Sequence, residues 1–157
     1  MERPLQIHGV AAALALDPDG PLVGALFLGA AGSGKSALVL SLVETCPWRR
    51  SALVADDVVL LAARERAVFA RPPGALAGLI EARGFGPVRV RTVPEARLLA
   101  AFDLALRAER APAPRIKEWS AALRLPVWPL APDEGALAGG AGRLRGILRA
   151  IVSGQTA

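Results

Sequence analysis

Cysteine, tyrosine and lysine are scarce in this chain of 157 residues, which has one Cys, no Tyr and only two Lys. Because Cys46 is alone, an internal disulfide and a zinc site built from several thiolates are both excluded. A single free thiol agrees with a reducing compartment, and we expect a cytoplasmic protein. No apolar run reaches the roughly 20 residues of a membrane-spanning helix, so we expect no membrane partner.

Aromatic residues are few as well, with four Phe and three Trp spread along the chain. Proteins that bind single-stranded nucleic acid place rows of aromatic side chains beside a basic groove. The formal net charge is +5, but the basic residues are scattered, and all except Lys35 and Lys117 are Arg. We therefore attribute the charge to an arginine-biased composition and expect no nucleic acid partner.

Hydrophobic residues make up 53% of the sequence and charged residues 21%, which is enough for a hydrophobic core and argues against disorder. The length suits one compact domain. Apolar segments separated by turns, together with one segment of helical spacing, predict an α/β fold. We expect a single P-loop domain over residues 1–157, with a mixed, largely parallel sheet flanked by helices.

The expected elements follow from hydrophobic spacing and from Gly and Pro positions. Strands are expected over 6–16, 22–28 and 51–55, a helix over 36–44, and a hairpin over 58–69. Later in the chain we expect a helical turn at 75–81, an edge strand over 88–93, a helix or strand pair over 94–110, and extended connectors at 112–114 and 126–132. A basic helix over 143–152, opened by Gly139-Gly140, is expected in the last segment, from Gly139 to Ala157.

One pattern carries specific chemistry, because G-x-x-x-x-G-K-[ST] is met in full by Gly29-Ala30-Ala31-Gly32-Ser33-Gly34-Lys35-Ser36. Glycines allow the backbone to curl so that successive N–H groups face phosphate oxygens. Lys35, expected as an exposed cation, would contact the terminal phosphates, and the Ser36 hydroxyl can ligate Mg²⁺. The helix that follows presents its positive end to the anion. The pattern therefore predicts a nucleoside triphosphate bound with magnesium.

A rival interpretation uses some of the same residues. The pattern Gly32-x-Gly34-x-x-Ala37 matches a dinucleotide-binding fingerprint, and Asp56 lies at about the distance of its ribose-binding acid. That short fingerprint leaves Gly29 and the Lys35-Ser36 pair unexplained. A glycine-rich turn without any ligand is the other alternative, but the strand before and the helix after the loop favour the phosphate-binding interpretation.

Asp56 and Asp57 follow the apolar strand expected at 51–55. In an open α/β sheet the carboxyl ends of strands line the ligand crevice, so this pair should face the glycine-rich loop. A carboxylate there can accept the proton of an attacking hydroxyl or hold magnesium through water. The alternative is an acidic turn that caps a helix.

Three segments together resemble the HPr kinase/phosphorylases of bacterial phosphotransferase systems: Leu53-Val54-Ala55-Asp56-Asp57, Ile80-Glu81-Ala82-Arg83-Gly84-Phe85-Gly86 and His8-Gly9. The resemblance runs over residues 7–86, with weaker matches to 131, and is to the compact form that has the catalytic domain only. It implies an ATP- and Mg²⁺-dependent serine kinase that acts on HPr or an HPr-like phosphocarrier protein. We also expect a homo-oligomer.

The resemblance implies roles for individual residues. Asp56 would accept the serine proton, supported by the pair of His8 and Asp57. Ser36 and Glu81 would hold magnesium, and Lys35 would bind phosphate. Arg83 would be a further catalytic residue. Arg110 is the best candidate for an arginine that the family uses in a later segment.

Each of these residues also has a plainer interpretation. A lone His8 is more often a core or surface histidine. Glu81 and Arg83 alternate on one face and could pair with each other. Arg110 could be a solvated charge at a helix end.

The chain departs from the family at one late motif, Pro-Val-x-Pro-Gly-Arg, which is associated with removal of phosphate from HPr. Here the sequence reads Pro126-Val127-Trp128-Pro129-Leu130-Ala131, without the glycine and the arginine. We therefore expect kinase activity with weak or absent phosphorylase activity. Two alternatives remain: a P-loop kinase of a small molecule, and a nucleotide-sensing regulatory domain that has no need of Asp56.

Overall fold

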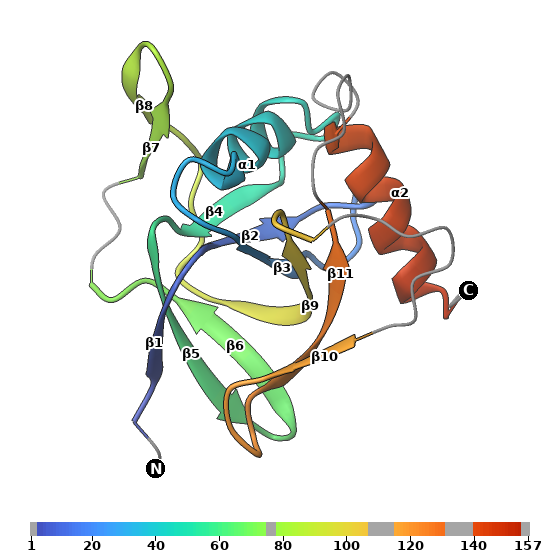
Figure 1. Ribbon diagram of the computed structural model, residues 1–157. Coiled ribbons are helices and arrows are strands. Elements are labelled where there is room, and N and C mark those ends of the chain that lie inside the picture. Colours follow the sequence, from blue (N-terminus) through green and yellow to red (C-terminus); the bar gives the residue numbers. More distant parts are fainter. Residues whose placement is uncertain (1–2, 75–77, 107–114, 131–139, 155–157) are drawn as a thin grey trace.

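The computed structural model describes residues 3–74, 78–106, 115–130 and 140–154. The first six strands are β1 (Leu5–His8), β2 (Val10–Leu14), β3 (Val23–Leu28), β4 (Ala52–Ala55), β5 (Val58–Arg64) and β6 (Ala67–Arg71). They are followed by β7 (Leu79–Ala82), β8 (Gly86–Arg89), β9 (Ala96–Asp103), β10 (Arg115–Glu118) and β11 (Arg124–Pro129). The helices are α1 (Lys35–Glu44) and α2 (Gly140–Val152) (Figure 1).

The main sheet is mixed, as predicted, but it is mostly antiparallel, so the prediction of a largely parallel sheet is wrong. Its order is β1-β5-β6-β9-β3-β2-β4, with β11 and then β10 continuing from β9. Among the described strands, β9 pairs in parallel with β3 and with β11, and an isolated parallel bridge joins Leu53 of β4 to Thr92. Short turns join β2 to β3 and β5 to β6, and a short turn can only connect antiparallel neighbours.

Both faces of the sheet at β2 are buried, because alternate residues of a strand point to opposite faces. Val10, Ala12 and Leu14 belong to a core cluster that contains residues of α1 and α2. Ala11 and Ala13 belong to a second cluster with residues of β5, β6 and β11. Two helices therefore cover one face of the central strands, and the strands of the other half of the sheet cover the opposite face (Figure 1).

The final helix is fixed to the C-terminal end of α1. Arg145 is buried and donates to Thr45 Oγ1 at 2.6 Å and to the Leu42 carbonyl at 3.4 Å. A cation in this position satisfies carbonyls that a helix end leaves free and interacts favourably with the helix dipole. The predicted basic helix is confirmed, and it already begins at Gly140.

Three other predicted segments differ from the structure. The helical turn expected at 75–81 is wrong where it is described, because β7 occupies Leu79–Ala82 and pairs with β8. The described part of the connector expected at 126–132 is largely strand β11, and the described part of 94–110, which ends at 106, contains the single strand β9. In each case a long-range pairing partner, invisible to local spacing, decides the conformation. The connector expected at 112–114 lies outside the described residues.

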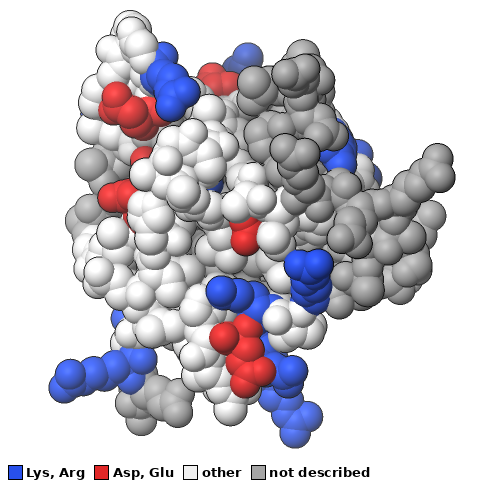
Figure 2. Space-filling view, in the orientation of Figure 1, with Lys and Arg blue, Asp and Glu red and all other residues white. Residues whose placement is uncertain are grey.

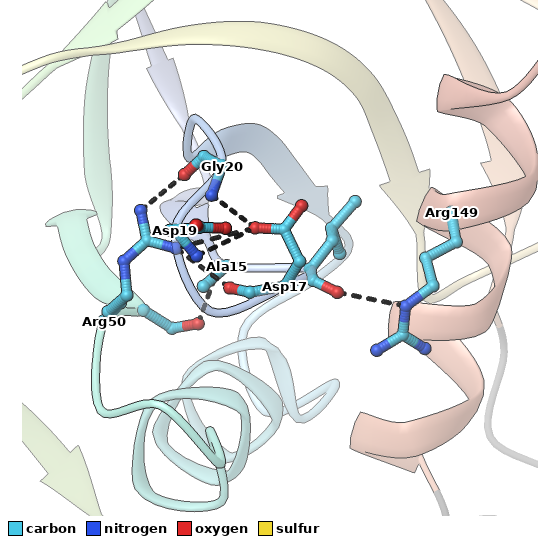
Figure 3. Close-up of polar contacts among 8 residues, drawn as sticks. Ala15, Asp17, Asp19, Gly20, Arg50 and Arg149 are labelled. Atoms are coloured by element: carbon cyan, nitrogen blue, oxygen red, sulfur yellow. Dashed lines mark hydrogen bonds and ion pairs between the residues drawn. The ribbon is translucent and has the colours of Figure 1, made fainter.

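Side chain to backbone hydrogen bonds hold the β2–β3 turn in place. Arg50 donates to the carbonyls of Asp17 and Gly20, and Arg149 of α2 donates to the carbonyl of Leu16 (Figure 3). The Ser51 hydroxyl accepts a hydrogen bond from the Ala15 amide at 3.0 Å. We call this region, Asp17–Gly20 together with residues 46–51, the turn end of the sheet.

Charged side chains of both signs lie on the face shown in Figure 2, where Lys and Arg are interspersed with Asp and Glu. This view therefore shows no large surface of one sign. Within the described ranges, no helix is long and apolar enough to cross a membrane.

Candidate active site

The glycine loop, from Gly29 to Gly34, joins the end of β3 to the start of α1. Gly29, Gly32 and Gly34 have φ angles of 143°, 81° and 98°, a region that glycine enters without steric cost. A side chain at Gly29 would also meet Ser33 Oγ at 2.7 Å. The structure thus places the predicted glycines where the backbone turns require them.

Lys35 is buried, with 6% of its surface exposed, so the prediction of an exposed loop cation is wrong. Its Nζ donates to the carbonyls of Gly29 and Ala30 at 2.7 and 2.9 Å, and to Ser33 Oγ at 3.5 Å. The reason is geometric, since a curled loop turns some of its carbonyls inward and an ammonium group with three donors can satisfy them. The positive charge is therefore held inside the glycine loop.

Ser36 and Asp56, 20 residues apart in sequence, are joined directly. The Ser36 hydroxyl donates to Asp56 Oδ1 at 2.9 Å. Asp56 follows β4, which is separated from β3 only by β2, so its half-buried carboxylate lies beside the first turn of α1. The structure thus brings together a hydroxyl and a carboxylate, the hard oxygen donors that Mg²⁺ prefers.

His8 and Asp57 form the second pair, with 3.2 Å between Nδ1 and Oδ1. Asp57 is the centre of a three-residue turn, because the Val58 amide donates to the Asp56 carbonyl at 2.8 Å and Asp57 has a φ of 69°. The Gly9 amide holds this turn by donating to the Asp57 carbonyl at 3.0 Å. Such turns are rare and strained, and backbone strain of this kind concentrates at functional sites.

The β7–β8 hairpin carries the other two predicted residues, Glu81 and Arg83. Arg83 lies over the glycine loop, since a Cβ added at Gly32 would be 3.8 Å from its Nη2 atom. Glu81 is exposed on β7 and is not among the ion-pair partners found in the described part of the chain. The pairing of Glu81 with Arg83, the plainer interpretation, is thus not what the structure contains.

The predicted residues therefore fall into three groups. Lys35, Ser36 and Asp56 are joined at the glycine loop, and His8 and Asp57 are joined next to Asp56. Arg83 reaches the loop from the hairpin, whereas Glu81 is not gathered with other acids: across the described residues, no three or more His, Cys, Asp or Glu side chains form a possible metal site. Arg110 lies outside the described residues.

One residue next to the loop was missed from the sequence. Asp103 ends β9 and pairs in register with Leu28, the last residue of β3 before the loop. The next residue, Leu104, donates its amide to the Leu28 carbonyl at 2.9 Å. The available signal was an acid directly after an apolar run, the same signal that identified Asp56.

A triphosphate and Mg²⁺ fit the residues that are present. The Lys35 ammonium group donates to oxygens of the glycine loop, and phosphate oxygens can replace those contacts. Mg²⁺ usually takes only one or two protein oxygens and completes its shell with phosphates and water. Ser36 and Asp56 can provide these oxygens without a larger acidic cluster.

Comparison with known proteins identifies a solved structure that has a similar fold. No family model and no curated protein matches the chain. The structure is similar to that of the HPr(Ser) kinase/phosphatase from Coxiella burnetii, with a TM-score of 0.69 and 21% sequence identity over 96% of this chain and 94% of that chain. The α/β fold with a mixed sheet and few helices is thus shared with an HPr kinase, and the resemblance predicted from the motifs is confirmed at the level of the fold.

Proposed function

We propose that this chain is an ATP- and Mg²⁺-dependent serine kinase that phosphorylates HPr or an HPr-like phosphocarrier protein. The observation that carries the proposal is the hydrogen bond between Ser36 and Asp56, which joins the helix start after the glycine loop to a carboxylate from another strand. The fold shared with an HPr(Ser) kinase/phosphatase supports the choice of a protein acceptor. The expected homo-oligomer stays a prediction.

Nucleotide binding would begin with the glycine loop. Its backbone N–H groups and the N-terminus of α1 would bind phosphate oxygens, and the Lys35 ammonium would exchange the Gly29 and Ala30 carbonyls for those oxygens. Ser36 and Asp56 would hold magnesium, with Glu81 as a further ligand. When bound, Mg²⁺ neutralises charge that develops on the transferred phosphoryl group.

Asp56 would also receive the proton of the acceptor serine. Its Oδ1 atom is occupied by the Ser36 hydroxyl, which leaves Oδ2 for the acceptor. The neighbouring pair of His8 and Asp57 would hold the strained turn at Asp57 and supply a partner through which the proton can leave. Arg83, above the loop, would stabilise negative charge on the phosphates. Positioning and charge stabilisation are the main sources of catalysis in phosphoryl transfer.

The direction of the reaction depends on the segment that lacks the family's glycine and arginine. Pro126 to Pro129 belong to strand β11, and the amide of Leu130 donates to the carbonyl of Asp103, next to the glycine loop. In the sequence, Leu130 and Ala131 stand at the positions of the family's glycine and arginine, and neither offers the charge that would suit an attacking phosphate dianion. Phosphorolysis of the phosphorylated carrier should therefore be weak or absent.

The direct test is to incubate the protein with ATP, Mg²⁺ and purified HPr-type carriers, and to measure the mass of each carrier. The proposal expects one carrier to gain one phosphoryl group on a serine. Phosphorylation of a small molecule but of no carrier would favour a small-molecule kinase. Tight ATP binding without transfer to any acceptor would favour a nucleotide-sensing domain.

A further inference from the structure

The tip of the β7–β8 hairpin presents an aromatic ring to solvent. Phe85 is 83% exposed, more than the other exposed large apolar residues of the described chain, which are Leu79, Ile116 and Val152. A single exposed apolar side chain is ordinary, so its exposure needs to be considered together with its position. The hairpin forms a small sheet of its own and projects from the body of the molecule above α1 (Figure 1).

The base of this hairpin is anchored, which fixes where the tip lies. Ile80 on β7 is buried in the same core cluster as Val39 and Leu42 of α1. At the other end, Arg83 lies over Gly32 of the glycine loop. Phe85 follows Arg83 by two residues, a span of at most about 7 Å of chain. The tip is therefore on the side of the molecule that carries the glycine loop, with the Phe85 backbone one short step beyond the residue whose guanidinium reaches the loop.

The backbone of the tip is built to hold Phe85 outward. Gly84 and Gly86, on either side of the ring, have φ angles of 83° and 119°, and the Phe85 amide donates to the Ala82 carbonyl at 3.0 Å. A Cβ added at either glycine would meet no atom within 4 Å. The tip thus stands free of the rest of the described chain.

The projecting hairpin tip is better suited to bind another protein than to bind a nucleobase. Small ligands bind in concave sites that bury most of their surface, and a projecting tip offers no facing wall. A projecting ring can instead enter a hollow on another protein. Aromatic side chains also carry much of the binding energy at protein interfaces, and the tip offers one in Phe85.

We propose that the hairpin tip is the docking element for the acceptor protein, with Phe85 inserted into an apolar hollow beside the acceptor serine. This inference rests on the proposed kinase function and names the surface that selects its protein substrate. Arg83 would remain at the phosphates, so Phe85 would act on recognition of the acceptor and not on the transfer itself. The hairpin would thereby hold the acceptor protein on the side of the molecule that carries Asp56.

The test is a steady-state comparison of the parent protein with Phe85→Ala, with the HPr-type carrier as the varied substrate. Truncation of a central aromatic anchor typically weakens an interface by roughly tenfold or more. We expect the KM for the carrier to rise by that factor, while kcat and the KM for ATP stay unchanged. Phe85→Trp should keep most of the carrier affinity. Ile116→Ala, which removes an exposed apolar side chain from β10, serves as the matched control.

Equal carrier KM values for the parent and Phe85→Ala would overturn the docking proposal, and so would a rise in the KM for ATP alone. Calorimetric titration of the carrier into both proteins separates this outcome from a failure of the proposed function. A parent that binds the carrier without phosphorylating it is not its kinase, and the Phe85→Ala titration then decides the docking proposal alone. A parent that neither binds nor phosphorylates any carrier contradicts both proposals.

Discussion

The two ends of strands β3 and β4 are built in different ways. At the turn end, side chains bond to backbone: Arg50 to two carbonyls of the β2–β3 turn, and Ser51 to the Ala15 amide (Figure 3). At the loop end, which comprises the glycine loop with Asp56 and Asp57, the polar side chains bond mainly to one another or to the loop. The bonds at the turn end hold the backbone in place, whereas the polar groups at the loop end can exchange their partners for a ligand.

The comparison separates polar side chains that stabilise the fold from polar side chains that a ligand can contact. Hydrogen bonds from a side chain to the backbone satisfy groups that a turn or a helix end would otherwise leave free. Pairs such as Ser36–Asp56 and His8–Asp57 do not close any turn by themselves, yet they lie beside positive φ angles in the glycine loop and at Asp57. We infer that the turn end serves stability and the loop end serves chemistry.

The largest effect should come from Lys35→Ala at the loop end. Hydrogen bonds to charged groups are worth roughly 1.5–3 kcal/mol each, so the loss of two phosphate contacts should weaken binding of ATP–Mg²⁺ about a hundredfold or more. The fold should remain, because water can reach the loop carbonyls that Lys35 leaves. Calorimetric titration measures the affinity, with Lys117→Ala as the control. If Lys35→Ala bound ATP–Mg²⁺ with the affinity of the parent, the glycine loop would not be the nucleotide-binding site.

Beside the turn end the corresponding change is Arg145→Ala, which should reduce stability and spare binding, because Arg145 bonds to Thr45, the residue directly before 46–51. Arg145 is buried and bonded to the end of α1, so its removal should lower the free energy of unfolding by about 1.5–3 kcal/mol. Arg143→Ala, at an exposed position of the same helix, should change it by less than about 0.5 kcal/mol. Denaturant titration measures both. A large loss of ATP affinity in Arg145→Ala would contradict the division between the two ends.

A smaller effect at the turn end depends on pH. Burial raises the pKa of the Cys46 thiol, but the Ser51 side chain and three neighbouring backbone N–H groups outweigh it and lower the pKa from 9.0 to about 6. A pKa that is lower in the folded chain means that the ionised thiol stabilises the fold. This contribution is complete above pH 9, shrinks as the pH falls, and is lost below pH 6.

The comparison is with Cys46→Ala in denaturant titrations between pH 6 and 9. The free energy of unfolding of the parent, relative to that variant, should increase with pH by at most about 1.4 kcal/mol per pH unit. A difference that does not change with pH would show that the thiol has the same pKa in both states.

Local sequence signals were sufficient at the glycine loop. The motif, the apolar segment before it and the helical spacing after it predicted a strand, a loop and a helix, and β3, the loop and α1 occupy those positions. The acid pair was also predicted to face the loop, because it directly follows a short apolar strand. The hydrogen bond between Ser36 and Asp56 agrees with that prediction.

Features that depend on pairing between distant segments could not be predicted. The short turn at Asp17–Gly20 is a local signal that β2 and β3 are antiparallel, but the antiparallel pairings of β4 with β2 and of β6 with β9 join segments that are far apart in sequence. Local spacing predicts a helical turn where β7 lies, because only its pairing with β8 shows that Leu79 to Ala82 are extended. Burial of Lys35 likewise depends on how the loop carbonyls turn inward, which spacing alone does not reveal.

The central claim is that Asp56 at the loop end accepts the proton in phosphoryl transfer, and Asp56→Asn tests it most directly. Asparagine keeps an oxygen that can accept the Ser36 hydrogen bond but cannot act as a base. The amide oxygen can also remain beside magnesium, although without the carboxylate charge, so ATP–Mg²⁺ affinity should fall far less than transfer does. At saturating ATP–Mg²⁺ the single-turnover rate of transfer to the carrier should fall by more than about a hundredfold. Asp19→Asn, an exposed acid at the turn end, should keep the parental rate. A parental rate in Asp56→Asn would contradict the account.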